Sequence, residues 1–221
     1  MLRPVILAGL YFLFLAAILL GSAGRVDWPM AWAYLGVYLA FIIVAFLAVD
    51  PELIQERSHM KAGVKRWDVL LASLSFVWFS PLTLLVAGLD AGRFKWSPSF
   101  PAAVQPSALV VFAAGTAFAC WAEVTNKFFS TFVRIQTERG HRVVIDGPYA
   151  HVRHPGYAGT ISASVALPLA LGSLWALIPA FVGSWLLAVR TLFEDKTLME
   201  DLSGYREYAS RVRWRLLPGV W

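Results

Sequence analysis

The chain has 221 residues, of which 58% are hydrophobic and only 15% are charged, and its mean hydropathy is +0.62. Ordinary soluble domains have roughly 45–50% apolar and about 25% charged residues, so the composition argues against a water-soluble domain and against a disordered chain. Cys120 is the single cysteine, which excludes a disulfide-rich secreted scaffold. The composition indicates an integral membrane protein.

Six apolar segments follow one another along the chain, and a helix needs ~20 such residues to cross the ~30 Å hydrocarbon core. The first four cover 4–21, 28–49, 69–89 and 107–122, the last continuing helically through Glu123 and Asn126. Two shorter runs, 157–171 and 174–189, are split by Gly172 and Ser173 and predict a helical hairpin. We expect bends at the prolines inside these runs, which membrane helices tolerate: Pro81, Pro168 and Pro179. The predicted fold is an all-α, polytopic membrane helix bundle of about six spans.

The first apolar run has a competing interpretation as a signal peptide, because Arg3 precedes it and small residues end it at 21–24. Its apolar stretch is longer than the usual ~7–15 residues of a signal peptide. We therefore predict a retained membrane span.

The basic residues are distributed unevenly between the two sides of this six-span arrangement. One side holds 16 of the 19 Lys and Arg residues, and only Arg25, Arg93 and Lys95 lie opposite. An excess of Lys and Arg marks the cytoplasmic side, so both termini are predicted to be cytoplasmic, in the plasma (cytoplasmic) membrane. The net charge of +5 is explained by this asymmetry and by attraction to anionic membrane lipids, and we expect no nucleic-acid partner. The 16 are Arg3, Arg57, Lys61, Lys65, Arg66, Lys127, Arg134, Arg139, Arg142, Arg153, Arg190, Lys196, Arg206, Arg211, Arg213 and Arg215.

Unusual polar side chains are concentrated after the fourth span. Glu123 and Lys127 are four residues apart, a spacing that allows a pair on one helix face, and Asn126 lies between them at the expected membrane boundary. The three residues either form an ordinary interfacial helix end or line a ligand cavity, because polar groups at such depth are often functional.

The segment Arg153-His154-Pro155 directly precedes the fifth span. Pro155 suits the first turn of a helix, and such a start offers free backbone N–H groups to a carboxylate or phosphate, with Arg153 as a further anion ligand. Gly156 and Gly159 would allow close approach of a ligand or of another helix. The same pattern is also ordinary capping of a membrane helix.

Arg190 and Glu194 lie one helical turn apart at the end of the last span. They either pair with each other or bind a ligand, with Glu194 accepting its donors and Arg190 holding an acidic group. His151 and His154 have no second pair of ligands at a metal-binding spacing, so no metal is predicted. The basic and aromatic tail beyond Tyr205 either lies on the membrane surface or covers a cofactor.

These motifs in this order resemble one family. They are Gly147-Pro148-Tyr149, Arg153-His154-Pro155-x-Tyr157-x-Gly159, Glu194-Asp195 with Leu198, and Gly204-Tyr205-x-x-Tyr208-x-x-x-Val212 followed by Pro218. The pattern is similar to the isoprenylcysteine carboxyl methyltransferase and phospholipid methyltransferase superfamily of integral membrane enzymes, from about residue 127 onwards. One departure is Asp195, where the family typically has Glu.

The resemblance implies a methyltransferase that uses S-adenosylmethionine, bound in a cytoplasmic pocket formed by the C-terminal half (123–221), behind N-terminal membrane helices (1–122). A lipid-like or hydrophobic acceptor would enter sideways from the bilayer. The implied catalytic residues are Glu194, Arg190 and Asn126. The implied cofactor-binding residues are Gln136, Pro148, Tyr149, Arg153, His154, Pro155, Tyr157, Gly159, Glu194, Asp195 and Tyr208.

Two other functions are compatible with parts of the sequence. Membrane sterol and enone reductases, which bind NADPH, share an Arg-His-x-x-Tyr-x-Gly segment, but Pro155 and the acidic pair 194–195 favour the methyltransferase. A non-catalytic scaffold or transporter would leave the clustered motifs unexplained. The sequence leaves the chemical identity of the methyl acceptor open. A carboxylate acceptor needs no general base, whereas an amine or phenol needs a proton acceptor, for which Glu194 or His154 could serve.

Overall fold

The computed structural model describes residues 2–50, 52–54 and 63–221. Arg57 and Lys61, two of the basic residues assigned to the cytoplasmic side, lie outside the described residues. Within them, every regular element is a helix, as the sequence predicts.

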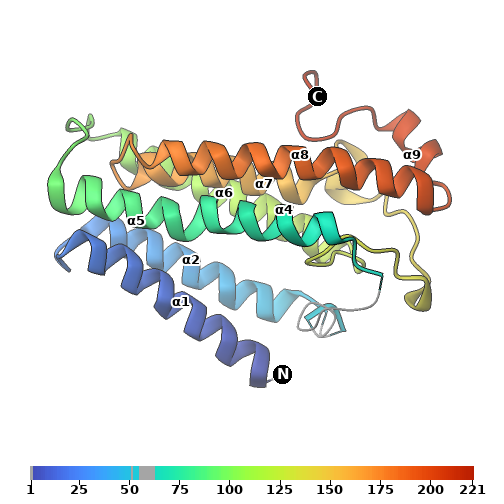
Figure 1. The fold of residues 1–221 in the computed structure, drawn as a ribbon, viewed down its shortest axis with the longest axis horizontal. Helices are drawn as coiled ribbons and strands as arrows, with labels where there is room; N and C mark the ends of the chain where they lie inside the picture. Colours follow the sequence, from blue (N-terminus) through green and yellow to red (C-terminus); the bar gives the residue numbers. More distant parts are fainter. Residues whose placement is uncertain (1, 51, 55–62) are drawn as a thin grey trace.

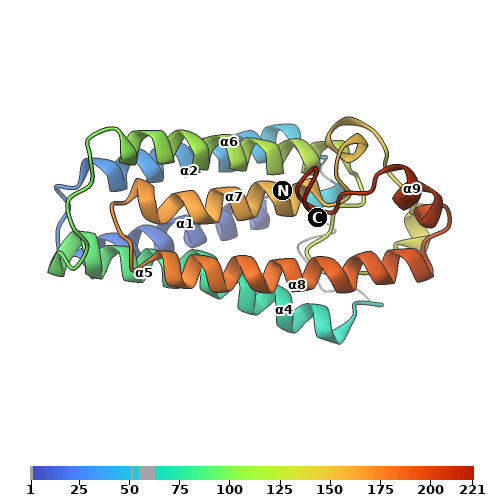
Figure 2. The same cartoon turned by 90° about the horizontal axis from the view of Figure 1, so that it is seen from above.

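The long helices lie side by side in a bundle (Figures 1 and 2). They are α1 (Leu2–Ala23), α2 (Pro29–Ala48), a rod formed by α4 (Arg66–Val77), η1 (Trp78–Leu82), α5 (Thr83–Ala87) and η2 (Gly88–Phe94), then α6 (Val104–Thr125), α7 (Pro155–Ala170) and α8 (Leu177–Asp201). The short elements η3 (Thr137–Arg139), η4 (Gly147–Ala150) and α9 (Tyr205–Arg211) lie toward one end of the bundle.

Five of the described helices are long and apolar enough to cross a membrane: Arg3–Ala23, Pro29–Ala48, Arg66–Phe94, Val104–Thr125 and Leu177–Asp201. The protein is therefore an integral membrane protein. The remaining apolar helix, α7, has 16 residues and is ~24 Å long at 1.5 Å per residue. It is joined to α8 by residues 171–176 and packs against α6 and α8.

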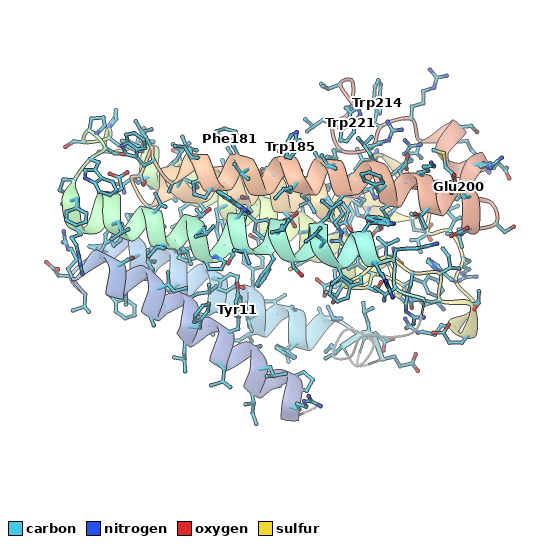
Figure 3. All side chains as sticks on the ribbon, in the orientation of Figure 1. Tyr11, Phe181, Trp185, Glu200, Trp214 and Trp221 are labelled. Carbon is cyan, nitrogen blue, oxygen red and sulfur yellow. The ribbon has the colours of Figure 1, made fainter. Side chains whose placement is uncertain are left out.

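The third apolar rod changes its helical winding at the predicted proline. Pro81 lies in the π-helical turn η1, because a proline lacks an N–H and its ring clashes with the preceding turn of an α-helix. The Thr83 hydroxyl donates to the carbonyl of Trp78 at 2.9 Å, which satisfies a carbonyl within this wide turn. The hydroxyls of Tyr11 (labelled in Figure 3) and Ser80 are 2.9 Å apart, so α1 packs at this turn.

The other two prolines lie where they disturb their helices less. Pro168 is in the last turn of α7. Pro179 is the third residue of α8, where the N–H has no partner within the helix and its absence costs little. A bend at Pro179 is therefore not required.

The larger of two hydrophobic clusters among the described residues joins the N-terminal and C-terminal helices. Leu15, Leu84, Phe112 and Leu167 come from four different helices and belong to one buried cluster. This cluster crosses the expected division at residue 122, whereas the smaller cluster of Leu202, Tyr205 and Tyr208 lies wholly after it.

Helices α6 and α7 approach each other closely at a pair of glycines. A Cβ atom on Gly159 would lie 2.5 Å from the carbonyl oxygen of Gly115, and one on Gly115 would lie 2.8 Å from the carbonyl oxygen of Gly159. Small residues allow such backbone contact between membrane helices. Gly159, which the resemblance implies to be a cofactor ligand, contacts α6 and is not among the residues that line the pocket described below.

The connectors at one end of the bundle are tied together by a buried carboxylate. Asp90 is fully buried and accepts hydrogen bonds from the hydroxyls of Ser97 and Ser173, each at 2.5 Å. These bonds join the connector after η2 to the α7–α8 connection, which lie at the same end in Figure 2. The candidate site lies at the opposite end.

Candidate functional site

A pocket opens at the end of the bundle where α6 ends, α7 begins and α8 meets α9 (right side of Figures 1 and 2). The irregular segment 126–146 covers it from one side. Its lining mixes aromatic, basic and hydroxyl groups with one acidic side chain. The lining residues are Asn126, Phe128, Phe129, Ser130, Val133, Arg134, His141, Arg142, Val143, Val144, Tyr149, Arg153, His154, Gly156, Tyr157, Glu194, Leu198, Leu202, Tyr205 and Tyr208.

Asp195 lies behind this lining, at the centre of a buried polar network. Its side chain is 2% exposed, and Arg153 Nη2 lies 3.0 Å from Oδ2. Arg215 Nε donates to Oδ2 at 3.0 Å, Tyr205 donates to Oδ1 at 2.9 Å, and His154 Nε2 lies 3.3 Å from Oδ1. Asp195 therefore orients residues that line the pocket and does not itself line it, in contrast to the direct cofactor contact that the resemblance implies.

The C-terminal tail docks on the start of α7. The N–H of Arg153 donates to the carbonyl of Trp214, and the N–H of His154 to that of Arg215, both at 2.9 Å. Trp214 and Trp221 of this tail are labelled in Figure 3. The tail thus belongs to the framework of the site.

The start of α7 is a poorer anion site than the sequence suggests. The N–H groups of Tyr157 and Ala158 both donate to the His154 carbonyl at 3.1 Å, and Pro155 has no N–H. The Phe129 ring packs on Gly156, where an added Cβ would lie 2.7 Å from Cε2. The expected row of free N–H groups is therefore reduced to that of Gly156 among the described residues.

One buried donor in the pocket wall is unused. Arg153 has a side chain only 5% exposed, and its Nε has no hydrogen-bond partner among the residues that the structure describes. An unsatisfied buried donor is costly, and a charged one more so. This N–H is available to a ligand.

Glu194 is the acidic side chain in the lining. Its Oε2 accepts a hydrogen bond from the Tyr157 hydroxyl at 2.5 Å. Adjacent helix positions point about 100° apart, which is why Glu194 faces the pocket while Asp195 faces the network behind it.

Arg190 pairs with a residue of α4 instead of Glu194. Its Nε and Nη2 donate to Asp68 at 2.6 and 3.0 Å, and Nη2 also donates to the Thr131 carbonyl at 2.8 Å. The guanidinium lies 5.2 Å from the centroid of the Tyr157 ring. Arg190 therefore packs against Tyr157 and is not among the residues that line the pocket, and its described hydrogen bonds go to Asp68 and Thr131 and not to Glu194.

Asn126, Tyr149 and Tyr208 form a second hydrogen-bonded group in the lining. Asn126 Nδ2 donates to the Tyr149 hydroxyl at 3.3 Å, and the Tyr208 hydroxyl donates to the Tyr149 carbonyl at 2.8 Å. Burial raises the pKa of Tyr208, so this phenol stays neutral. Lys127 is exposed and lies 5.4 Å from the Phe128 ring centroid.

Three other residues implied as cofactor ligands are not in the lining. Gln136 is fully buried, and its side chain donates to the Phe128 carbonyl at 2.7 Å, so it holds the segment 126–146 in shape. Pro148 is buried in η4, and Pro155 occupies the first position of α7. These residues shape the backbone around the pocket.

His141 is a lining residue that the sequence did not single out. It stacks on Phe128 with centroids 4.6 Å apart, and its Nδ1 accepts the N–H of Gln136 at 3.2 Å. Burial, with Arg134 and Arg139 nearby, lowers its pKa to about 4, so it is neutral at pH 7. The many polar residues of the segment 126–146 indicate a functional region in the sequence. Residue spacing alone, however, could not predict that this segment folds against α7 and α8. No group of three or more His, Cys, Asp or Glu residues in the described chain could hold a metal ion.

The fold and the pocket define an integral membrane protein with a polar, partly basic site at one end of its helix bundle. Residues 107–200 match the family model of the isoprenylcysteine carboxyl methyltransferase (ICMT) family. The match confirms the resemblance and supports a membrane methyltransferase in general. The matched stretch runs from α6 to near the end of α8 and leaves out α9 and the tail.

Proposed function

We propose that this protein transfers a methyl group from S-adenosylmethionine to a lipophilic acceptor that enters the pocket from the bilayer. The family match supports methyl transfer in a membrane. The finer assignment of donor and binding residues depends on whether the pocket fits the donor.

The unused Nε–H of Arg153 is the observation that carries this proposal. It is a buried cationic donor in a pocket wall, and a carboxylate is the group it fits best. The donor has such a carboxylate on its methionine part. Aromatic rings suit its adenine and its sulfonium, and the lining offers Tyr149, Tyr157 and Tyr208. His154 and Asn126 are further polar residues of the lining.

When bound, the donor supplies an activated methyl group on a positively charged sulfur. The protein then has to align the acceptor with that methyl group and exclude water. The tail braces the pocket-lining residues Arg153 and His154 through its backbone hydrogen bonds to them. We assign positioning roles to Asp195, which holds both residues, and to Arg190, which supports Tyr157.

We further propose that the pocket end faces the cytoplasm, that α7 is a sixth span, and that the protein resides in the plasma membrane. Lys127, Arg134, Arg142 and Arg213 lie at the pocket end or in the adjoining segments. The opposite end holds Arg25, Arg93 and Lys95. Such an imbalance favours a cytoplasmic location of the basic end.

Ligand-induced thermal stabilisation in detergent tests the donor, since a ligand that binds only the folded state raises its stability. S-adenosylhomocysteine should stabilise the protein and NADPH should not. Arg153→Lys keeps a cation beside Asp195 but removes the Nε–H, so it should weaken S-adenosylhomocysteine binding about tenfold or more. Arg213→Ala removes an exposed arginine and is the matched control. Equal affinities of the two variants would move the donor site away from Arg153.

A further inference from the structure

We propose that the tail after α9 binds anionic membrane lipid through an outward-facing patch, and that this binding strengthens the pocket at the start of α7. The patch consists of Arg213, Trp214, Leu217 and Val220, here termed the tail patch. Lipid binding by the tail patch is independent of the proposed function, whereas its effect on the pocket rests on the proposed donor.

The tail patch combines exposed apolar surface with positive charge. Trp214 is 37% exposed, Leu217 58% and Val220 74%. Arg213 is exposed as well, and among the described residues it has no ion-pair partner. Residues 205–221 contain four arginines and one acidic residue. Apolar side chains beside an excess of arginine are the combination that binds an anionic membrane surface.

The tail ends at the level where a membrane span begins. Figures 1 and 2 share the long axis of the bundle, along which the spanning helices run, and in both views the end of the tail lies near the level of the chain start. That start is the first residue of α1, which contains the candidate span Arg3–Ala23. Trp214 and Trp221, labelled in Figure 3, lie on the outside of the bundle beside α8. Tryptophan is enriched at this interfacial level, so lipid head groups are the partner within reach.

An ordered loop presents the tail patch. The N–H groups of residues 215–217 all donate to the main-chain oxygen of Trp221, at 3.0–3.1 Å. Gly219 has a φ of +81°, a left-handed conformation that glycine adopts at little cost. The Arg215 guanidinium lies 5.6 Å from the centroid of the Trp221 ring. A loop that is already folded loses little conformational freedom when it binds.

The inner side of the same loop holds the wall of the pocket. The carbonyl of Trp214 accepts the N–H of Arg153, and the carbonyl of Arg215 accepts that of His154, both at 2.9 Å. The Arg215 side chain donates to Asp195 at 3.0 Å. Arg153 and His154 are lining residues. One short stretch of chain therefore exposes side chains on the outside and braces the pocket with its main chain on the inside.

This arrangement couples the two binding events. A lipid that binds the docked tail favours the docked state, which also holds the wall of the pocket in place. Coupling between two sites is reciprocal. Anionic lipid should therefore raise the affinity for S-adenosylhomocysteine, and S-adenosylhomocysteine should raise the affinity for anionic lipid.

The first test measures lipid binding alone. The full-length protein in a neutral detergent is titrated with short-chain phosphatidylglycerol, which is anionic, or with phosphatidylcholine of the same chain length, and the melting temperature is followed. Phosphatidylglycerol should stabilise the protein at lower concentrations than phosphatidylcholine.

Two variants locate this binding. Arg213→Gln should weaken phosphatidylglycerol binding about fivefold, the usual effect of one basic residue at an anionic surface. Val220→Ser, which removes the most exposed apolar side chain of the tail patch, should weaken it as well. Lys196→Gln is the matched control, because it removes a cation of α8 whose side chain is 73% exposed. Equal responses to the two lipids, or no loss in either tail variant relative to Lys196→Gln, would overturn lipid binding by the tail patch.

The second test measures the coupling. Isothermal titration gives the affinity for S-adenosylhomocysteine with and without saturating phosphatidylglycerol. The lipid should raise this affinity severalfold in the unchanged protein and in Lys196→Gln, and less in Arg213→Gln at the same lipid concentration. Without the lipid, Arg213→Gln should bind S-adenosylhomocysteine as the unchanged protein does. An affinity that the lipid leaves unchanged would refute the coupling.

The outcomes distinguish this inference from the proposed function. If S-adenosylhomocysteine binds under no condition while phosphatidylglycerol binding depends on Arg213, the proposed donor is wrong and the lipid site stands. If S-adenosylhomocysteine binds but the response to phosphatidylglycerol depends on neither Arg213 nor Val220, the donor stands and the lipid site is refuted.

Discussion

Asp195 offers the strongest test of the framework behind the pocket. The change Asp195→Asn keeps the shape of the side chain but removes its charge. Arg153, whose side chain is 5% exposed, then loses its counter-ion, and Arg215 loses its charged acceptor. Breaking one partner of a buried ion pair costs ~3–5 kcal/mol, whereas surface pairs contribute ~0–1 kcal/mol.

This difference predicts a measurable separation in melting temperature. A change of 1 kcal/mol shifts Tm by about 2–4 °C in a chain of this size, so Asp195→Asn should lower Tm by roughly 6–20 °C. Glu200→Gln on the same helix should shift it by no more than a few degrees, because that side chain is exposed. Thermal unfolding in detergent, followed by tryptophan fluorescence, measures both.

The same network predicts that Asp195→Asn affects ligand binding as well as stability. Because Asp195 holds Arg153, His154 and the tail residue Arg215, the variant should also bind S-adenosylhomocysteine more weakly at temperatures where it is folded. A Tm equal to that of Glu200→Gln would refute the conclusion that this network stabilises the fold.

Three further predictions concern topology, packing and pH. The topology is tested with single-cysteine variants made in a chain that lacks the native cysteine. A membrane-impermeant thiol reagent applied to intact cells should label Ser99→Cys, whereas it should label Gly140→Cys only after permeabilisation. The reverse pattern would overturn the proposed orientation. Gly159→Ala should cost ~1–3 kcal/mol through overpacking, because its Cβ would lie 2.5 Å from a carbonyl oxygen of α6. Gly36→Ala in α2, with nothing within 4 Å, is the control, and equal Tm values would contradict the close packing. The folded-state pKa of His141 is about 4, below its ordinary 6.5, so the unfolded chain binds the proton first and stability should fall as the pH drops from about 6.5 to about 4. His141→Asn should show a smaller decrease over that range in thermal unfolding at a series of pH values, and identical curves would exclude His141 as the source.

Much of the architecture follows from local sequence properties. Hydropathy alone predicts the long apolar helices. A helix that crosses the membrane needs enough consecutive apolar residues to match the thickness of the hydrocarbon core. The structure has α6 end at Thr125, with Asn126 as its cap, within a residue of the expected end. The changed winding at Pro81 also follows from the chemistry of one residue. The family pattern was recognisable because its residues lie close together in the sequence.

Only the tertiary structure decided which of these residues face one another. Asp68 lies 122 residues from Arg190 in the chain, so no local spacing could reveal that the two are paired. Glu194 and Asp195 are adjacent and chemically alike, and the rotation of α8 against α7 and α9 alone places the first in the pocket and the second in the network behind it. Gly159 lies against α6 for the same reason. Local sequence determines helices and their ends, whereas the partners of polar groups depend on how the helices are rotated and packed, which is set by contacts between distant segments.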